Sequence, residues 1–457
     1  MEGGLQAPVR HAHGFKEPDY LDETKLESEL RRVFDVCHGC RRCFNLCDSF
    51  PRLFELIDGS DSGELDSVSS DGFGFVMDGC TLCDMCFMVS CPYVPPHEFG
   101  IDFPHLVLRY RAVQWSKGAV SWFDRQLGRT DRNGKLAAKI SWLANWCSRT
   151  TNRLMRSALE MFAGLDREAS LPKYHRLTLM RRTDCQPAEI VSTAPSSGRK
   201  VAIFATCFAN YNDPDIGLAA RGVLARNGVD CTFVYPECCG MPQLEQGDFW
   251  AVAEKAKQIS AELVAWINKG YEIVTLVPSC SLMLKFEWPL IVPDDSNIKI
   301  LSANTFDISE YVVGLQEGQG GTGGLTALPG AVTVHLACHA RAQNIGLKAV
   351  EMLRLIPEVD LTVVERCSGH GGAWGMKKEN FDTALRVGKP AARQAVKAAS
   401  AFVVSECPLA GEHLRQGMER MTDGSHLVKQ VTHPIQLLAY AYGLEQPELR
   451  GDNVDQS

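Results

Sequence analysis

The sequence predicts a mixed α and α/β architecture, in which an α-helical domain and a basic helical connector precede two tandem α/β modules. Three observations support this: two tight cysteine groups near the N-terminus, a basic stretch with helical periodicity, and a duplicated strand–helix–strand pattern in the C-terminal half. At 457 residues and 45% hydrophobic content, the chain can bury several apolar cores.

The two ends of the chain are polar, and we expect residues 1–20 to be a disordered arm and residues 448–457 to be a tail. The N-terminal stretch lacks the apolar segment of a secretory leader, so the eighteen cysteines predict a reducing, cytoplasmic location. The most apolar run, 273–284, is short and is interrupted by Pro278, which argues against a membrane span.

Eight cysteines form the two N-terminal groups, each beginning with a CxxCxxC run: Cys37, Cys40, Cys43 and Cys47, then Cys80, Cys83, Cys86 and Cys91. Such a run lets three thiolates reach one cubane cluster. Zinc sites usually present cysteines as separated pairs, and a redox dithiol or disulfide needs only one pair. The duplication therefore favours two [4Fe–4S] clusters over zinc or a disulfide.

In such runs the fourth cysteine of each group ligates the other cluster. The predicted ligand sets are thus crossed: Cys37, Cys40 and Cys43 with Cys91, and Cys80, Cys83 and Cys86 with Cys47. Two details depart from the bacterial ferredoxin pattern, because Asp48 stands where proline usually follows and four residues separate Cys86 from Cys91. We assign residues 21–108 to a ferredoxin-like two-cluster domain.

Residues 109–186 form a basic connector. Its first part, 109–156, contains eleven Lys and Arg against two Asp, and four of the eight tryptophans of the chain. Apolar residues recur at helical spacing over 135–162, which predicts an amphipathic helix. Cations beside tryptophan are typical of a helix bound to an anionic membrane surface, and the alternative is a helix packed on a neighbouring domain. No nucleic-acid motif accompanies the charge, so no nucleic-acid partner is expected.

Two polar linkers, 187–200 and 316–330, flank two similar segments: module one at 201–315 and module two at 331–447. VAIFATC in module one matches VTVHLAC in module two, each a predicted strand that ends in cysteine. A helix, a second strand and a cysteine loop closed by glycine follow in both, and then a third strand with its cysteine. This duplication predicts two α/β units with cysteines at the strand ends.

The carboxyl ends of parallel strands form the crevice where ligands bind, so the repeated cysteines should converge there. Module one offers four thiols, Cys207, Cys238, Cys239 and Cys280, whereas module two offers three, Cys338, Cys367 and Cys407, with Ser368 in the remaining place. Buried cysteines can also act as small apolar residues, which suffices for Cys147, Cys185 and Cys231.

These motifs, especially PECCGMPQLEQGDF with PSCSLMLKFEWP, and ACHARAQNIG with ERCSGHGGAWGMKKENF, resemble those of the CCG-domain iron–sulfur proteins. That family includes iron–sulfur components of anaerobic glycerol-3-phosphate dehydrogenase, glycolate oxidase and heterodisulfide reductase. The resemblance implies that a flavoprotein dehydrogenase partner supplies electrons and that the chain passes them toward membrane quinone. It also implies peripheral binding to the inner face of the cytoplasmic membrane.

The resemblance further implies an iron–sulfur cluster in module one. Met283 and Ala410 occupy the last cysteine position of the CxxC that completes a heterodisulfide-reductase site. This favours a four-thiolate cluster in module one over disulfide chemistry, which remains the alternative function. Module two is open between a cluster with a free site, a cluster ligated by His339 or His370, and no cluster. No flavin motif is present, so substrate oxidation is expected on the partner, and no catalytic residue is assigned.

Overall fold

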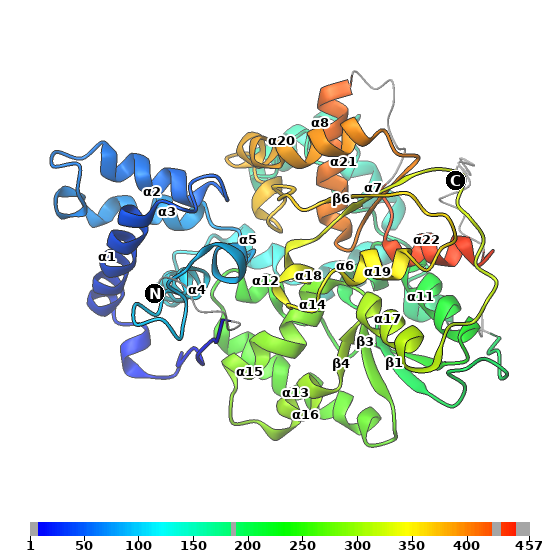
Figure 1. The fold of residues 1–457 in the computed structure, drawn as a ribbon. Helices are drawn as coiled ribbons and strands as arrows, with labels where there is room; N and C mark the ends of the chain where they lie inside the picture. Colours follow the sequence, from blue (N-terminus) through cyan, green and yellow to red (C-terminus); the bar gives the residue numbers. More distant parts are fainter. Residues whose placement is uncertain (1–7, 184–188, 423–430, 445–457) are drawn as a thin grey trace.

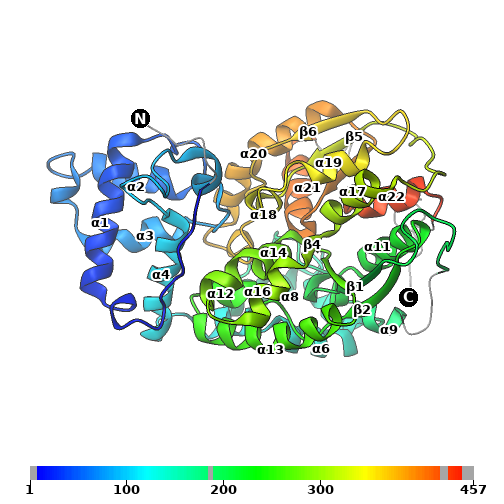
Figure 2. The ribbon, with the colours of Figure 1, turned by 60° about the horizontal axis from the view of Figure 1, so that its bottom comes forward.

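The computed structural model describes residues 8–183, 189–422 and 431–444. The tail expected at 448–457, the first seven residues of the expected arm and Cys185 lie outside them. The N-terminal region is helical, as expected. Its elements are η1 (Pro18–Tyr20), α1 (Glu23–Cys40), α2 (Ser49–Asp58), η2 (Leu65–Ser67), η3 (Ser70–Gly72), α3 (Phe73–Asp78), η4 (Cys86–Ser90) and α4 (Phe103–Ser116). Helices α1 to α4 form a lobe at one end of the molecule (Figure 2).

Residues 8–20 differ from the disordered arm that their polarity predicts. The segment runs along α4 and module one, and buries the side chains of His13, Phe15 and Tyr20. Arg10 is held by ion pairs with Asp84, Asp102 and Glu287. These partners are distant in sequence, so local composition gave no sign of the contacts.

Module one is an α/β unit with a four-stranded parallel sheet in the order β2-β1-β3-β4 (Figure 1). The strands are β1 (Lys200–Phe204), β2 (Asp230–Val234), β3 (Glu272–Thr275) and β4 (Thr305–Asp307). The helices are α10 (Cys207–Tyr211), α11 (Pro214–Arg226), α12 (Met241–Leu244), α13 (Phe249–Ile267), α14 (Pro278–Leu282), η5 (Met283–Glu287), α15 (Trp288–Ile291), α16 (Ser296–Ala303) and α17 (Ile308–Gln319).

Module two repeats the design with a three-stranded parallel sheet in the order β6-β5-β7. The strands are β5 (Val332–His335), β6 (Leu361–Val364) and β7 (Phe402–Ser405). The helices are α18 (Cys338–Ala342), α19 (Lys348–Leu353), η6 (Trp374–Met376), α20 (Phe381–Ala398), α21 (Pro408–Thr422) and α22 (Pro434–Ala441). The predicted pair of parallel α/β modules is confirmed.

The connector differs from the single amphipathic helix expected over 135–162. It contains α5 (Trp122–Leu127), α6 (Thr130–Lys139), α7 (Ser141–Ser148), α8 (Arg153–Ala163) and α9 (Leu179–Thr183). The chain leaves helical geometry at Ile140, and Asn152 caps a new helix by accepting the N–H of Met155. Helix α4 also crosses the boundary expected at 108/109, and α17 extends into the linker expected at 316–330.

The apolar cores join the parts of the chain. One core combines residues of α1 to α4 with residues of module one, among them Phe34, Phe103 and Phe249. A second combines both sheets, including Val201, Val334 and Ile435. Shared cores fix the relative positions of the cysteine groups. No helix among the described residues has both the length and the apolar character needed to cross a bilayer.

Candidate iron–sulfur centres

The first N-terminal set surrounds a small cavity of about 20 Å³. Its lining contains four cysteines, Cys37, Cys40, Cys43 and Cys91, together with Phe50 and Phe54. Burial raises the pKa of Cys37, and the neighbouring Cys91, Cys43 and Cys40 raise it further. Cys91 thus lies with the first group, as the crossed ligand sets predict.

The second set brings Cys47 from the first group to the later cysteines. Burial raises the pKa of the Cys47 thiol, and Cys80 and Cys83 add to the effect. Burial also raises the pKa of Cys86, with further contributions from Cys83, Cys80 and Cys47.

The loop that carries these later cysteines contains two non-glycine residues in the left-handed region, Leu82 at φ 52° and Asp84 at φ 64°. Such strain persists only where surrounding contacts hold it. Here Arg10 binds the Asp84 carboxylate in a bidentate manner, through Nη1 at 2.9 Å and Nη2 at 2.8 Å. The N-terminal segment therefore helps to fix the loop of the second set.

Module one gathers its four cysteines where strands β1, β2 and β3 end. The Sγ atoms of Cys207 and Cys238 are 3.7 Å apart, and those of Cys239 and Cys280 are 3.2 Å apart. Hydrogen bonds from Cys207 and Cys239 lower the pKa of Cys238 well below the usual thiol value. One thiolate is therefore favoured within the quartet, and thiolates are the form that binds metal.

Asp131 of the connector is a site residue that the sequence analysis missed. Its carboxylate accepts the backbone N–H of Cys238 at 3.0 Å, the Tyr235 hydroxyl, and the Lys255 ammonium at 3.4 Å. It reaches the loop because α6 packs closely on α10, where Gly134 leaves room for the Tyr211 ring. The only signal in the sequence is that Asp131 is acidic within a basic stretch.

Module two brings three thiols together with the N-terminal domain. Burial raises the pKa of Cys338 well above its usual value, and Cys83, Cys367 and Cys407 contribute. The ring of His339 is engaged elsewhere, with Nδ1 2.8 Å from the Ser279 hydroxyl and Nε2 3.1 Å from the Leu82 carbonyl oxygen. His339 is therefore a poor ligand candidate.

His370 is the other histidine considered as a ligand in module two. It is buried, and its Nε2 has no hydrogen-bond partner within the described part of the chain. Of the two histidines, only His370 stays open as a ligand.

A cavity of about 1270 Å³ connects these centres. It is lined by cysteines of the second N-terminal set and of both modules: Cys47, Cys80, Cys83, Cys207, Cys238, Cys239, Cys280, Cys338, Cys367 and Cys407. Arg111 bridges its walls, donating to the carbonyl oxygens of Cys80 at 2.6 Å and Glu245 at 2.9 Å. The domain interface is also tied by Trp374, whose indole N–H donates to the Asp78 carbonyl oxygen.

The donors present fit iron–sulfur chemistry. Buried thiols in sets of four, on loops that follow helix and strand ends, are the donor type that clusters require. The set in module two has three thiols and is complete only if another donor joins it.

Comparison with known proteins places this geometry among relatives. The family model of the cysteine-rich CCG domain matches residues 201–285 and again 332–415. The chain is 28% identical to the iron–sulfur relative from Escherichia coli that carries the name of anaerobic glycerol-3-phosphate dehydrogenase, of which it is one subunit. That match covers 69% of this chain and 76% of the relative.

Two archaeal proteins are also similar. One is a subunit of the fumarate reductase (CoM/CoB) of Methanothermobacter marburgensis, to which the chain is 27% identical over 55% of this chain and 48% of that protein. The other is an iron–sulfur protein of Methanocaldococcus jannaschii, to which the chain is 29% identical over 57% of this chain and 50% of that protein.

Proposed function

This chain belongs to the family of iron–sulfur proteins with two CCG cysteine-rich domains, and from that premise we propose that it is the electron-transfer component of a dehydrogenase. In this proposal a flavoprotein partner oxidises the primary substrate, and this chain delivers the electrons to membrane quinone. The relatives named as components of a dehydrogenase and a reductase support an electron-transfer role.

The observation that carries the proposal is the common cavity of about 1270 Å³. Thiols of the second N-terminal set and of both modules line it, so donor groups from separate domains lie in one continuous space. The first set, with its own small cavity, lies closer to the far end of the α1–α4 lobe (Figure 1). Bound clusters would supply one-electron carriers there, since their potentials depend on burial and on hydrogen bonds near sulfur.

The residues around module one suit a cluster of four thiolates. Trp288 is fully buried and donates to the Cys239 carbonyl oxygen at 3.1 Å, and Asp131 holds the Cys238 amide. These contacts fix the cysteine loop. Met283 is fully buried, and Ala410 offers no donor, so neither module has the thiol that would complete a heterodisulfide-type site. This favours electron transfer over the alternative of a disulfide reductase.

A surface on the connector supports the proposed location at the inner face of the membrane. Large apolar side chains are exposed along α5 to α8, namely Trp122, Phe123, Leu136, Ile140, Trp142, Trp146, Leu154, Met161 and Phe162. Basic residues share these helices, the composition that binds anionic bilayers.

The test supplies electrons to the anaerobically purified protein and compares acceptors. We expect the dithionite-reduced protein to reduce a soluble quinone analogue and not a disulfide. Cys280→Ser should reduce the quinone rate at least about tenfold, because it removes one buried donor from module one. Cys231→Ser is the matched control, since this thiol faces the Val229 carbonyl oxygen and not the cavity. Efficient disulfide reduction with no quinone reaction would favour the alternative.

A further inference from the structure

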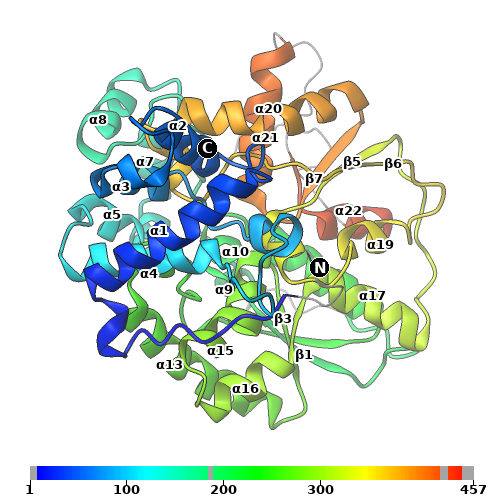
Figure 3. The same ribbon diagram turned by 60° about the vertical axis from the view of Figure 1, so that its left-hand side comes forward.

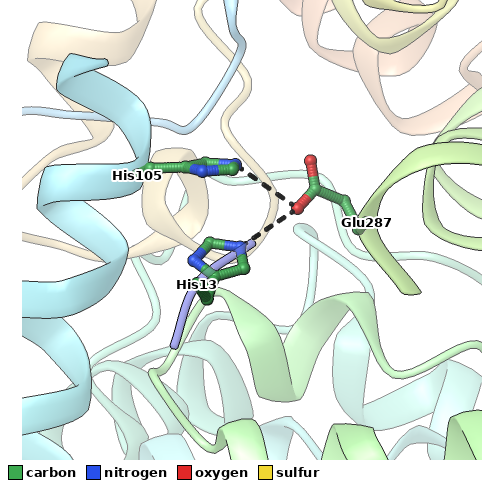
Figure 4. Close-up of side chains that lie close together, drawn as sticks. All are labelled: His13, His105 and Glu287. Atoms are coloured by element: carbon green, nitrogen blue, oxygen red, sulfur yellow. Dashed lines mark ion pairs between the residues drawn. The ribbon is translucent and has the colours of Figure 1, made fainter. Parts of the chain in front are cut away.

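A histidine–carboxylate cluster lies outside the cysteine sites. His13 comes from the N-terminal segment, His105 from α4, and Glu287 from the end of η5 in module one (Figure 4). One ligand atom of each residue lies within 4.8 Å of the others. Both imidazole Nε2 atoms are 3.6 Å from the same Oε2 atom of Glu287. Three distant segments thus aim nitrogen and oxygen at one point.

These three atoms lack the hydrogen bonds that buried polar atoms normally make. Within the described residues, the Nε2 atoms of His13 and His105 and the Oε2 atom of Glu287 are all buried without a hydrogen-bond partner. A separation of 3.6 Å exceeds hydrogen-bond length. Leaving such groups unsatisfied costs about 1–3 kcal/mol each, so their convergence calls for an additional partner.

The surroundings of His105 present its Nε2 lone pair to the cluster. The Nδ1 atom lies 3.4 Å from Asp102 Oδ2, which favours the proton on Nδ1 and leaves Nε2 unprotonated. Burial lowers the pKa of His13 to about 4, so that ring is also neutral near pH 7. Two nitrogen lone pairs then face a carboxylate oxygen, an arrangement that a cation stabilises. A carboxylate behind a histidine is common around protein-bound metals.

The charge of the neighbourhood also favours a cation. Three carboxylates, Asp84, Asp102 and Glu287, contact one guanidinium, that of Arg10, at 2.8, 3.0 and 3.2 Å. With neutral imidazoles this buried group has two excess negative charges. A divalent ion would balance them, and burial makes that balance valuable.

We propose that His13, His105 and Glu287 bind a divalent transition-metal ion of the zinc or ferrous class. Two imidazole nitrogens and a carboxylate oxygen are the donors that such ions accept. Bonds of about 2.0–2.2 Å in tetrahedral geometry put neighbouring donors roughly 3.3 Å apart, close to the observed spacing. The ion would tie the N-terminal segment and α4 to module one, and so hold two cysteine-bearing domains together.

The experiment uses the full-length protein with its clusters intact. We would dialyse it anaerobically against micromolar Zn²⁺, count zinc by mass spectrometry and record the zinc K-edge absorption. We expect one additional zinc per chain, coordinated by nitrogen and oxygen only. Glu287→Gln and His105→Ala should each weaken zinc binding by at least about tenfold. His11→Ala is the matched control, because His11 is exposed and only two residues from His13.

Unchanged iron and sulfide contents would show that the variants are folded, and the absorption spectrum of the unmodified protein needs no variant at all. No zinc uptake by that protein, a zinc shell containing sulfur, or equal affinity in the Glu287→Gln variant would each overturn the proposal.

Discussion

At the scale of single residues, each thiol takes its surroundings from distant parts of the chain. Cys91 lies beside Cys37 and Cys43, which belong to the other group in sequence. Cys83 reaches the thiols of module two, and its pKa is raised by burial and by Cys367. The chemical identity of a ligand is local, but its cluster mates are set by the fold.

The crossed arrangement gives a prediction for single substitutions. Cys91→Ser should alter the EPR signal of the centre held by Cys37, Cys40 and Cys43, and Cys47→Ser that of the other centre, because each removes a thiolate from a different set. Iron analysis and EPR after reduction would measure this. Cys147→Ser should change neither signal. If Cys91→Ser affected the same centre as Cys83→Ser, the crossed assignment would be wrong.

At the scale of elements, the glycine after each cysteine loop explains why the repeat includes it. Gly240 follows CC in module one at φ 88°, and Gly369 follows CS in module two at φ 80°. Both occupy the left-handed region that other residues rarely adopt. A Cβ at Gly369 would also lie 1.9 Å from the Ala384 carbonyl oxygen, so the loop packs directly on α20.

Replacing this glycine should therefore destabilise module two. Gly369→Ala is expected to cost about 1–3 kcal/mol in the free energy of unfolding, through strain and overpacking. A lower melting temperature by circular dichroism would measure it. Gly318→Ala serves as the control, because its Cβ would meet nothing within 4 Å in α17. Equal melting temperatures for the two variants would contradict the prediction.

Module two should also lose stability in acid because it buries neutral histidines. Burial lowers the pKa of His335 to about 4, that of His413 to about 4 and that of His433 to about 3. Between pH 6.5 and about 4 the unfolded chain binds more protons, so stability falls as pH falls, by up to about 1.4 kcal/mol per pH unit for each histidine.

The side chain of His335 makes two contacts, with the Ser405 hydroxyl and the Arg366 carbonyl oxygen. His335→Gln should flatten the dependence of melting temperature on pH between 7 and 5, whatever its effect at pH 7. His11→Gln, at an exposed position, is the control. An unchanged slope in His335→Gln would show that this ring does not take up a proton on unfolding.

At the scale of the whole molecule, the connector packs on both modules and also forms an outer surface. Asp131 contacts module one, and Ser170 binds Glu412 of module two through its hydroxyl. Figure 3 shows α5, α7 and α8 along one side of the molecule. The two interpretations of the basic stretch therefore describe different faces, one packed on protein and one exposed.

The exposed face predicts binding to anionic vesicles. Each near-surface cation contributes about 1 kcal/mol, screened by salt, and tryptophan insertion adds to this. Co-sedimentation should weaken with added salt and with Trp142→Ala plus Trp146→Ala, whose side chains are 74% and 48% exposed. Trp250→Ala is the matched control, being 45% exposed on α13. Binding that ignores both salt and the double substitution would indicate a protein partner instead.

The sequence by itself determined the features that are encoded locally. Cysteine spacing indicates cluster ligands, because a short loop limits which thiolates can reach one cubane. The repeat predicts two parallel sheets with cysteines at the ends of β1, β2, β3 and of β5, β6, β7, since alternation of strands and helices is a short-range pattern.

Only the tertiary structure decided which distant groups meet. It placed residues 8–20 against module one, divided the expected connector helix, and brought Asp131 to Cys238. It also assembled His13, His105 and Glu287 from three segments. None of these contacts leaves a periodic or spaced signal in one sequence, because each depends on how whole domains pack through their shared apolar cores.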